Sequence, residues 1–154
     1  MRHPTKTALA SLKITGDDSV IVSLKSPNGQ GCLYFQSIDQ FAEAVKKRHI
    51  RAKRWIVSVP QSLCITKTIE LPAEHLEQAY KMLEFELSTY LPLPAEELVY
   101  GCVPLGRKEN LLKVCVYILK IKTLDTFLAR FKSIGITPAN ELVDSVALKN
   151  WFNR

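Results

Sequence analysis

The residues of this sequence best suited to chemistry are its histidines, cysteines and clustered glutamates, and their spacing forms no catalytic or metal-binding set. His3, His49 and His75 stand far apart, and no two of the four cysteines have CxxC spacing. Glu84 and Glu86 could form a pair of carboxylates, but side chains two positions apart on a helix point about 200° apart. No nucleophile elbow, HExxH motif or GxxxxGK(S/T) phosphate loop is present. We therefore expect neither enzyme activity nor a metal site.

The cysteines and the hydropathy pattern favour a cytosolic protein. Each cysteine falls in an apolar, strand-like segment, so we expect four reduced thiols that are buried or half-buried: Cys32, Cys64, Cys102 and Cys115. The longest strongly apolar run, residues 114–119, is much shorter than the roughly 20 residues that a membrane helix needs. The N-terminal stretch lacks the apolar core of a secretory signal.

Charge is segregated along the chain, whose net charge is +6. Residues 1–69 carry 11 Lys and Arg against 4 Asp and Glu, and residues 101–154 carry 9 against 4. Residues 70–100 reverse the sign, with one Lys against seven Glu. The sequence therefore places one acidic stretch between two basic ones.

Alternating apolar residues predict that the chain begins with three antiparallel strands, a helix and a fourth strand. The turn signals are Gly16-Asp17-Asp18 and the Asn28-Gly29 pair. Ser37 and Gln40 fit a capping box at the start of the helix. The predicted strands are 7–15, 19–25, 32–36 and 55–59, and the predicted helix is 38–49.

A second module is predicted after Pro60, with the order strand, helix, two strands, helix. Pro72 is expected to open its first helix, and Pro92 and Pro94 to end it. The apolar stripe of that helix comprises Leu76, Ala79, Tyr80, Leu83, Leu87 and Tyr90, broadened by Met82 and Phe85. The strands are predicted at 62–70, 99–105 and 111–121, the last of them central, and a helix capped by Thr123 is expected to end at Gly135. A loop or short strand at 136–143 and a helix start at 144–152 follow.

The densest basic run spans residues 46–54. Cations are favoured at a helix C-terminus, so one interpretation is a helix end followed by a solvated loop. An anionic membrane surface or nucleic acid phosphates are the alternatives, and nucleic acid is the least favoured because only Trp55 could stack on a base. The basic residues are Lys46, Lys47, Arg48, Arg51, Lys53 and Arg54.

Residues 57–106 resemble PilM, the actin-like family of type IV pilus assembly, and more loosely the cytoplasmic domain of the secretion protein GspL. The resemblance rests on a strand ending in Leu71-Pro72, the Glu84-x-Glu86 helix, the Leu-Pro-Leu-Pro exit at 91–94, and the pair Glu96-Glu97. It implies a mixed α/β (α+β) fold. A partial actin-like, ribonuclease H-like subdomain at 1–60 and 136–154 would be interrupted by an SHS2-like module of the FtsA type at 61–135.

The resemblance also draws attention to a missing nucleotide loop. Actin-like ATPases hold phosphate and metal on a D-x-G-x-x-x-x-K/T loop near their start, whereas this chain has a hairpin turn, Gly16-Asp17-Asp18, in the equivalent stretch. We therefore expect no ATP site in this chain and no other cofactor.

The resemblance implies a non-enzymatic scaffold at the cytoplasmic face of the inner membrane. Its expected partner is the cytoplasmic tail of a bitopic, PilN-like membrane protein, held in a groove between the two modules. The acid-rich helix and its proline exit then belong to a docking module. The residues expected to contact the partner are Trp55, Val59, Gln61, Tyr80, Leu83, Glu84 and Leu87.

Other interpretations stay open at this point. Self-association and attachment to an anionic membrane surface are compatible with a scaffold. A small basic nucleic-acid-binding domain that uses residues 46–54 is one alternative function, and an inactive fragment of an actin-like ATPase is another.

Overall fold

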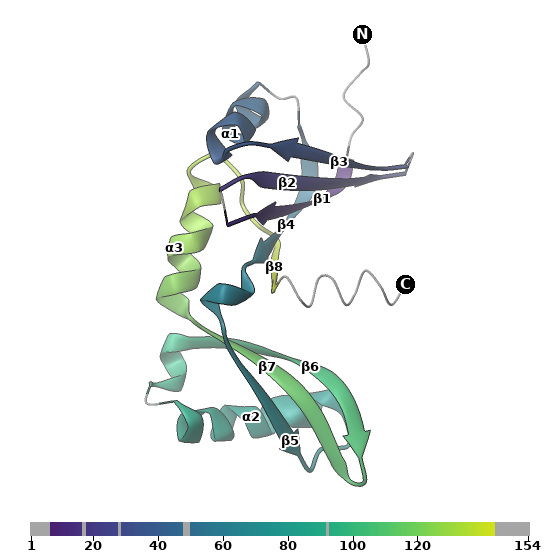
Figure 1. Ribbon diagram of the computed structural model, residues 1–154, viewed down its shortest axis with the longest axis vertical. Helices are drawn as coiled ribbons and strands as arrows, with labels where there is room; N and C mark the ends of the chain where they lie inside the picture. Colours follow the sequence, from purple (N-terminus) through teal and green to yellow (C-terminus); the bar gives the residue numbers. More distant parts are fainter. Residues whose placement is uncertain (1–6, 17, 28, 48–49, 92, 144–154) are drawn as a thin grey trace. The chain divides into compact units, whose positions relative to one another are not determined.

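The computed structural model describes residues 7–16, 18–27, 29–47, 50–91 and 93–143 (Figure 1). These residues divide into two compact units. The first unit contains the described residues up to Gln61 and from Phe127 onward, and the second contains Ser62–Thr126.

The first unit is built on a mixed sheet with strand order β3-β2-β1-β4-β8. The first three strands pair antiparallel, as predicted, and β4 and β8 extend the sheet in parallel beside β1. The strands are β1 (Thr7–Ile14), β2 (Val20–Ser26), β3 (Gly29–Phe35), β4 (Ala52–Val59) and β8 (Asn140–Val143).

One face of this sheet forms a core because its apolar residues alternate with polar ones. Leu12 lies opposite Val22 on β2 and Val57 on β4, and all three side chains are fully buried. Residues of the opposite parity, such as Ser11 and Lys13, are half-exposed. Period-two patterning therefore sets which face of the sheet is covered.

Helix α1 (Ile38–Lys46) begins at the predicted capping box. The Gln40 amide donates to Ser37 Oγ at 3.3 Å, and the Gln36 amide donates to Gln40 Oε1 at 3.0 Å. The fully buried ring of Phe41 packs against the ring of Trp55 on β4, which fixes the helix on the sheet. The helix ends before the predicted position 49, because Lys47 is already its C-cap.

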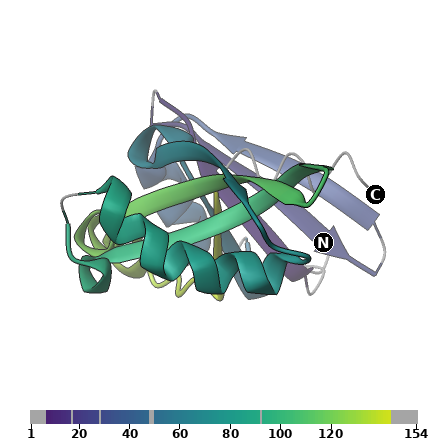
Figure 2. The same ribbon diagram turned by 90° about the horizontal axis from the view of Figure 1, so that it is seen from below.

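The second unit is a three-stranded antiparallel sheet, ordered β5-β7-β6, with α2 along one face (Figure 2). The apolar strand β7 is central, as predicted. Its alternate residues Leu112, Val114, Val116 and Ile118 are buried in the core beneath the helix. The elements are β5 (Ile65–Leu71), α2 (Leu76–Tyr90), β6 (Leu98–Lys108) and β7 (Leu111–Lys120), with short 3-10 turns at Gln61–Leu63 and Ala95–Glu97.

Two predicted helix starts are wrong. Helix α2 begins at Leu76, because His75 still has an extended backbone and Ala73 is held in a turn on Leu71. Helix α3 (Ile121–Lys132) follows β7 directly, so Thr123 lies inside the helix and does not cap it. Gly135 does adopt the left-handed conformation expected after a helix, with φ 81°.

The return from the second unit to the first falls inside α3. The prediction placed this boundary at residue 135, whereas the first unit resumes at Phe127. Phe127, Leu128 and Phe131 are all buried, which gives the C-terminal half of α3 an apolar face to pack. The helix start predicted at 144–152 lies outside the described residues.

Candidate functional site

Two tyrosines and a glutamate meet where α2 lies beside β6. The Cys102 backbone N–H donates to Tyr80 Oη at 3.2 Å, and the rings of Tyr80 and Tyr100 have centroids 6.3 Å apart. Glu84 follows Tyr80 by one helical turn and is exposed. We call Tyr80, Glu84 and Tyr100 the tyrosine–glutamate cluster.

The pKa values around the cluster are raised. Burial raises the pKa of the Tyr100 hydroxyl, and the nearby Glu84 carboxylate adds to the shift because it disfavours a second negative charge. Burial also raises the pKa of the Cys102 thiol, although a hydrogen bond with Tyr80 opposes this. Both groups therefore stay protonated at neutral pH, and Glu84 is the group of the cluster that offers a negative charge.

The raised Cys102 pKa predicts a loss of stability in alkali. A group whose pKa is higher in the folded state contributes stability below its unfolded pKa and loses it as the pH rises through the folded value. The urea unfolding midpoint should therefore fall above pH 9.0, the ordinary pKa of a thiol. It should fall less steeply in Cys102→Ala, measured by circular dichroism at several pH values. Identical slopes in the two proteins would show that this thiol does not contribute.

The Tyr80 hydroxyl should contribute to stability through Cys102. Tyr80→Phe keeps the ring and leaves the Cys102 N–H without this acceptor, so we expect a loss of about 0.5–1.5 kcal/mol in the free energy of unfolding. Chemical denaturation measures the loss. Tyr100→Phe is the matched control, and an equal loss in both variants would argue against a role for this hydrogen bond.

The acidic stretch exposes its glutamates on the second unit, but not all on one face, because Glu70 lies between the buried Ile69 and Leu71 on β5 and so points away from α2. Helix α2 and the turns at its ends carry all but one of its glutamates. Every one of them is exposed except Glu86, which is half-buried: Glu70, Glu74, Glu77, Glu84, Glu86, Glu96 and Glu97. The only Lys of the stretch, Lys81, is also exposed. A cationic partner of α2 and the turns at its ends would thus meet carboxylates on a chain that is otherwise basic.

Several predicted contact residues belong to the core. Leu83 and Leu87 are buried between α2 and its sheet, and Val59 is buried in the first unit. Buried side chains offer no surface, so the structure gives these three a packing role, contrary to our prediction. An apolar stripe on a helix indicates either a docking face or a face packed in the core. The sequence pattern alone does not distinguish the two, and here the stripe is packed in the core.

Trp55 and Gln61 remain partly accessible in the first unit. Trp55 is half-buried against Phe41, and its carbonyl accepts a bond from the Ala139 amide. Gln61 is exposed at the start of the turn after β4. The groove predicted between the two modules stays a prediction.

Phe85 and Cys32 are exposed although both were expected inside. Phe85 comes two residues after Leu83, about 200° round the helix, and 78% of its surface is exposed. Cys32 lies on β3, whose residues 29–34 are exposed on both faces. An apolar local pattern did not reveal that this strand forms the sheet edge.

Arg107 was not singled out from the sequence. Its guanidinium donates to the carbonyl oxygens of Ala73, at 3.0 Å, and Glu74, and so ties strand β6 to the turn that precedes α2. The contact joins residues more than 30 positions apart, so no local pattern could have identified it.

The basic side chains of this run are exposed wherever the structure describes them. Lys46, Arg51, Lys53 and Arg54 are exposed, and Arg48 lies outside the described residues. Lys47 forms an ion pair with Glu43 at 2.5 Å, one helical turn away. The helix-end interpretation accounts for Lys46 and Lys47, whereas Lys53 and Arg54 lie on strand β4 and not in the predicted loop.

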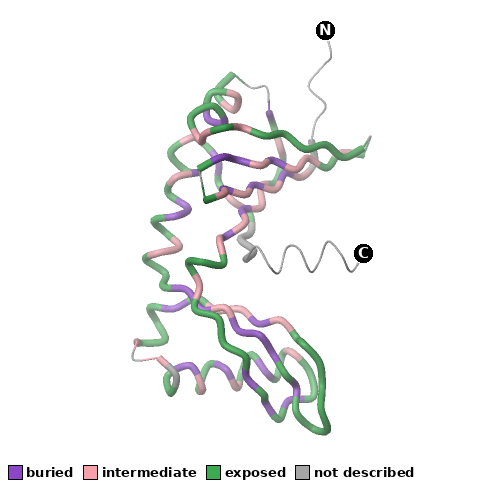
Figure 3. The backbone as a smooth tube through the Cα atoms, in the orientation of Figure 1, coloured by how far each residue is buried: buried purple, intermediate pink, exposed green. Residues whose placement is uncertain are grey.

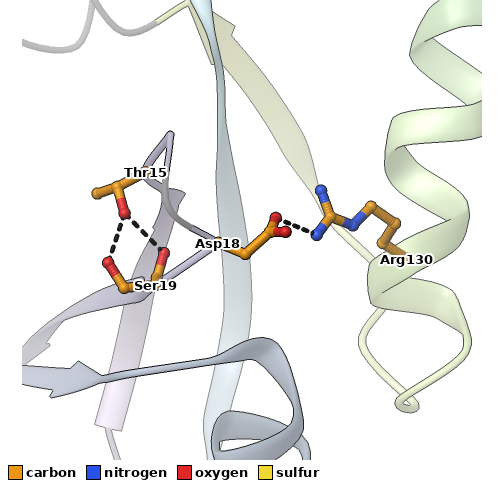
Figure 4. Close-up of polar contacts among 4 residues, drawn as sticks. All are labelled: Thr15, Asp18, Ser19 and Arg130. Atoms are coloured by element: carbon orange, nitrogen blue, oxygen red, sulfur yellow. Dashed lines mark hydrogen bonds and ion pairs between the residues drawn. The ribbon is translucent and has the colours of Figure 1, made fainter.

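The turn between β1 and β2 is held together by its own side chains and by α3 (Figure 4). Asp18 pairs with Arg130 on α3 at 2.7 Å, and Thr15 Oγ1 bonds to Ser19, whose side chain is buried. Asp18 adopts a left-handed backbone with φ 63°. This is the position where the actin-like resemblance would place a phosphate loop.

The described residues contain no group of three or more His, Cys, Asp or Glu side chains that could hold a metal ion. No helix among them has both the length and the apolar character to cross a membrane.

Comparisons with known proteins find likeness in structure alone. No family model and no curated protein matches the sequence. The structure of the PilM–PilN type IV pilus biogenesis complex matches with a TM-score of 0.71 at 16% identity, over 92% of this chain and 48% of that one. The fold is PilM-like. The cytoplasmic domain of EpsL, an inner membrane component of the type II secretion system of Vibrio cholerae, matches with a TM-score of 0.61 at 16% identity.

The PilM-like fold agrees with the predicted actin-like class. The EpsL match covers 88% of this chain and 57% of that domain, so the chain spans about half the length of both solved structures. At 16% identity the likeness concerns the fold, and the function has to be argued from the residues of this chain.

Proposed function

We propose that the chain is a non-enzymatic scaffold of a type IV pilus or type II secretion assembly platform, and that it binds the cytoplasmic tail of a bitopic, PilN-like membrane protein. Two solved structures that share the fold of this chain come from such systems. One is the cytoplasmic domain of EpsL and the other is the PilM–PilN complex. A scaffold of this kind would lie in the cytoplasm, peripheral to the inner membrane.

The acidic surface of the second unit carries the proposal. Cytoplasmic segments next to membrane spans are enriched in Lys and Arg, so the tail of a bitopic protein is expected to be basic. Residues 70–100 offer seven glutamates against one lysine in a chain whose net charge is +6. This is the stretch of the chain whose charge complements such a tail.

The tyrosine–glutamate cluster is the proposed anchor within that surface. Glu84 can pair with a Lys or Arg of the tail. The half-exposed rings of Tyr80 and Tyr100 can pack against the aliphatic part of that Lys or Arg, or contact its charged group. Trp55 and Gln61 of the first unit remain the other proposed contacts. Leu83, Leu87 and Val59 support these elements from inside.

We also propose that this chain works without a nucleotide. The support is the turn between β1 and β2, where the Asp18 carboxylate pairs with Arg130 and the Thr15 hydroxyl bonds to Ser19. Titration with magnesium-ATP should give no binding heat, and saturable one-to-one binding would refute this part of the proposal.

Calorimetric titration with a synthetic peptide tests the proposal. The peptide is the N-terminal cytoplasmic tail of the pilus or secretion membrane protein encoded beside this chain. We expect one-to-one binding that weakens as salt rises, because exposed charges are screened. Binding should weaken several-fold in Glu84→Gln, by about 1 kcal/mol as for an exposed ion pair.

Asp125→Asn is the matched control, since Asp125 is also exposed on the second unit but lies on α3. It should bind like the unaltered protein. The proposal fails if the peptide gives no heat at high concentration. It also fails if duplex DNA binds with steep salt dependence while the peptide does not, since that result would favour residues 46–54 as a nucleic-acid site.

A further inference from the structure

The five-stranded sheet ends at an edge strand without the usual protection. Edge strands expose backbone N–H and C=O groups that recruit other strands, and proteins commonly block them with charges, prolines or bulges. Strand β3, Gly29–Phe35, contains no charged residue and no proline, and its register with β2 is uninterrupted. Figure 3 shows most of the strand as exposed, and only Phe35 at its end is half-buried. Tyr34 is 61% exposed and Leu33 is 38% exposed.

The two edge strands of the three-stranded sheet are protected. Strand β5 carries the exposed charges Lys67 and Glu70, and β6 has a bulge between Pro104 and Gly106. Protection of β5 and β6 and its absence on β3 indicate that β3 has a partner.

We propose that β3 pairs antiparallel with β3 of a second copy of this chain, about a twofold axis at Cys32. Residues of an antiparallel strand alternately direct their backbone groups toward one neighbour and then the other. Counted from the Ser26–Gly29 pair that closes the hairpin, the outward set is Gln30, Cys32 and Tyr34. Centring the pair on Cys32 brings the outward sets of the two copies together and joins the two sheets.

The strand is complementary to itself in this register. Leu33 of one copy lies opposite Gly31 of the other, and Phe35 lies opposite Gly29, so each large apolar residue faces a glycine across the strands. Large side chains that cover a facing glycine are a recognised way of fixing strand register. The symmetry of the pair is that of an isologous dimer, in which the same patch is used twice.

Charge favours a second copy over a basic tail at this edge. Two copies with net charge +6 repel each other, and the repulsion is smallest along a strip that carries no charge. A basic tail would find no carboxylate on β3 and would find several on α2. The proposal therefore goes beyond the tail-binding function and does not depend on it.

Sedimentation velocity over a dilution series tests the pairing. The unaltered protein should show a reversible monomer–dimer equilibrium, and Tyr34→Lys should weaken it by about tenfold or more, because a lysine on an edge strand opposes pairing. Thr68→Lys is the matched control, an exposed position on the edge strand β5, and it should dimerise normally. Far-UV circular dichroism confirms that both variants are folded.

Cross-linking locates the axis. A short bis-maleimide should link two copies through Cys32, whose thiol is exposed. The linked dimer should be lost in Cys32→Ser and kept in Cys64→Ser. A protein that stays monomeric throughout, a dimer indifferent to Tyr34→Lys, or a dimer without a Cys32 cross-link would each overturn the proposal. So would a monomer whose β3 amides become protected only when the tail peptide is added.

Discussion

Replacing Leu83 by alanine is expected to lower the free energy of unfolding of the second unit by roughly 2–5 kcal/mol, the cost of leaving a cavity beneath a packed helix. Leu83 is fully buried between α2 and its sheet. Urea denaturation followed by far-UV circular dichroism measures the loss. A large loss would show that Leu83 packs in the core. A residue that only contacts a partner would cost little stability when replaced.

Phe85→Ala is the control on the same helix. Its ring is 78% exposed, so we expect a change within about 0.5 kcal/mol, as for surface substitutions generally. If Phe85→Ala costs as much as Leu83→Ala, the helix is not seated on the sheet as described. If Leu83→Ala costs nothing, the side chain is not part of a packed core.

The first unit should respond to Phe41→Ala with a loss of roughly 3–5 kcal/mol in its free energy of unfolding. The ring of Phe41 is fully buried and contacts both Phe35 on β3 and Trp55 on β4. Its removal takes away the contact that fixes α1 on the sheet. Tryptophan fluorescence during guanidinium denaturation reports the transition, because Trp55 is an immediate neighbour.

Glu43→Ala on the same helix is the companion variant. It removes the exposed Glu43–Lys47 ion pair, and such pairs contribute about 0–1 kcal/mol. If Glu43→Ala lowered the free energy of unfolding more than Phe41→Ala, the buried ring would not be the larger contribution, contrary to our expectation.

Features that depend on local spacing could be predicted from the sequence. The capping box at Ser37 and Gln40, the central position of β7 and the left-handed Gly135 each depend on residues a few positions apart. The antiparallel pairing of β1 with β2, of β2 with β3 and of β6 with β7 follows from the same patterns, since short connections favour neighbouring strands. The PilM-like fold was therefore accessible from local signals joined to a resemblance.

Features that depend on long-range contacts could not be predicted. The bond from the Cys102 amide to Tyr80 and the bonds from Arg107 to the turn before α2 join residues 22 to 34 positions apart. The exposure of Cys32 depends on β3 being the last strand of its sheet, and alternation within β3 says nothing of that. For the candidate site, the acidic stretch was visible in the sequence, but the buried state of Leu83 and Leu87 was not.

Hydrogen exchange of the chain with and without the tail peptide shows where the partner binds. We expect slower amide exchange on α2 around Tyr80 and Glu84 and on β6 around Tyr100, with little change in the basic run at 46–54. Slower exchange confined to that basic run would show that the partner binds there and not on α2 and β6. Unchanged exchange everywhere at saturating peptide would contradict a docking role for this chain.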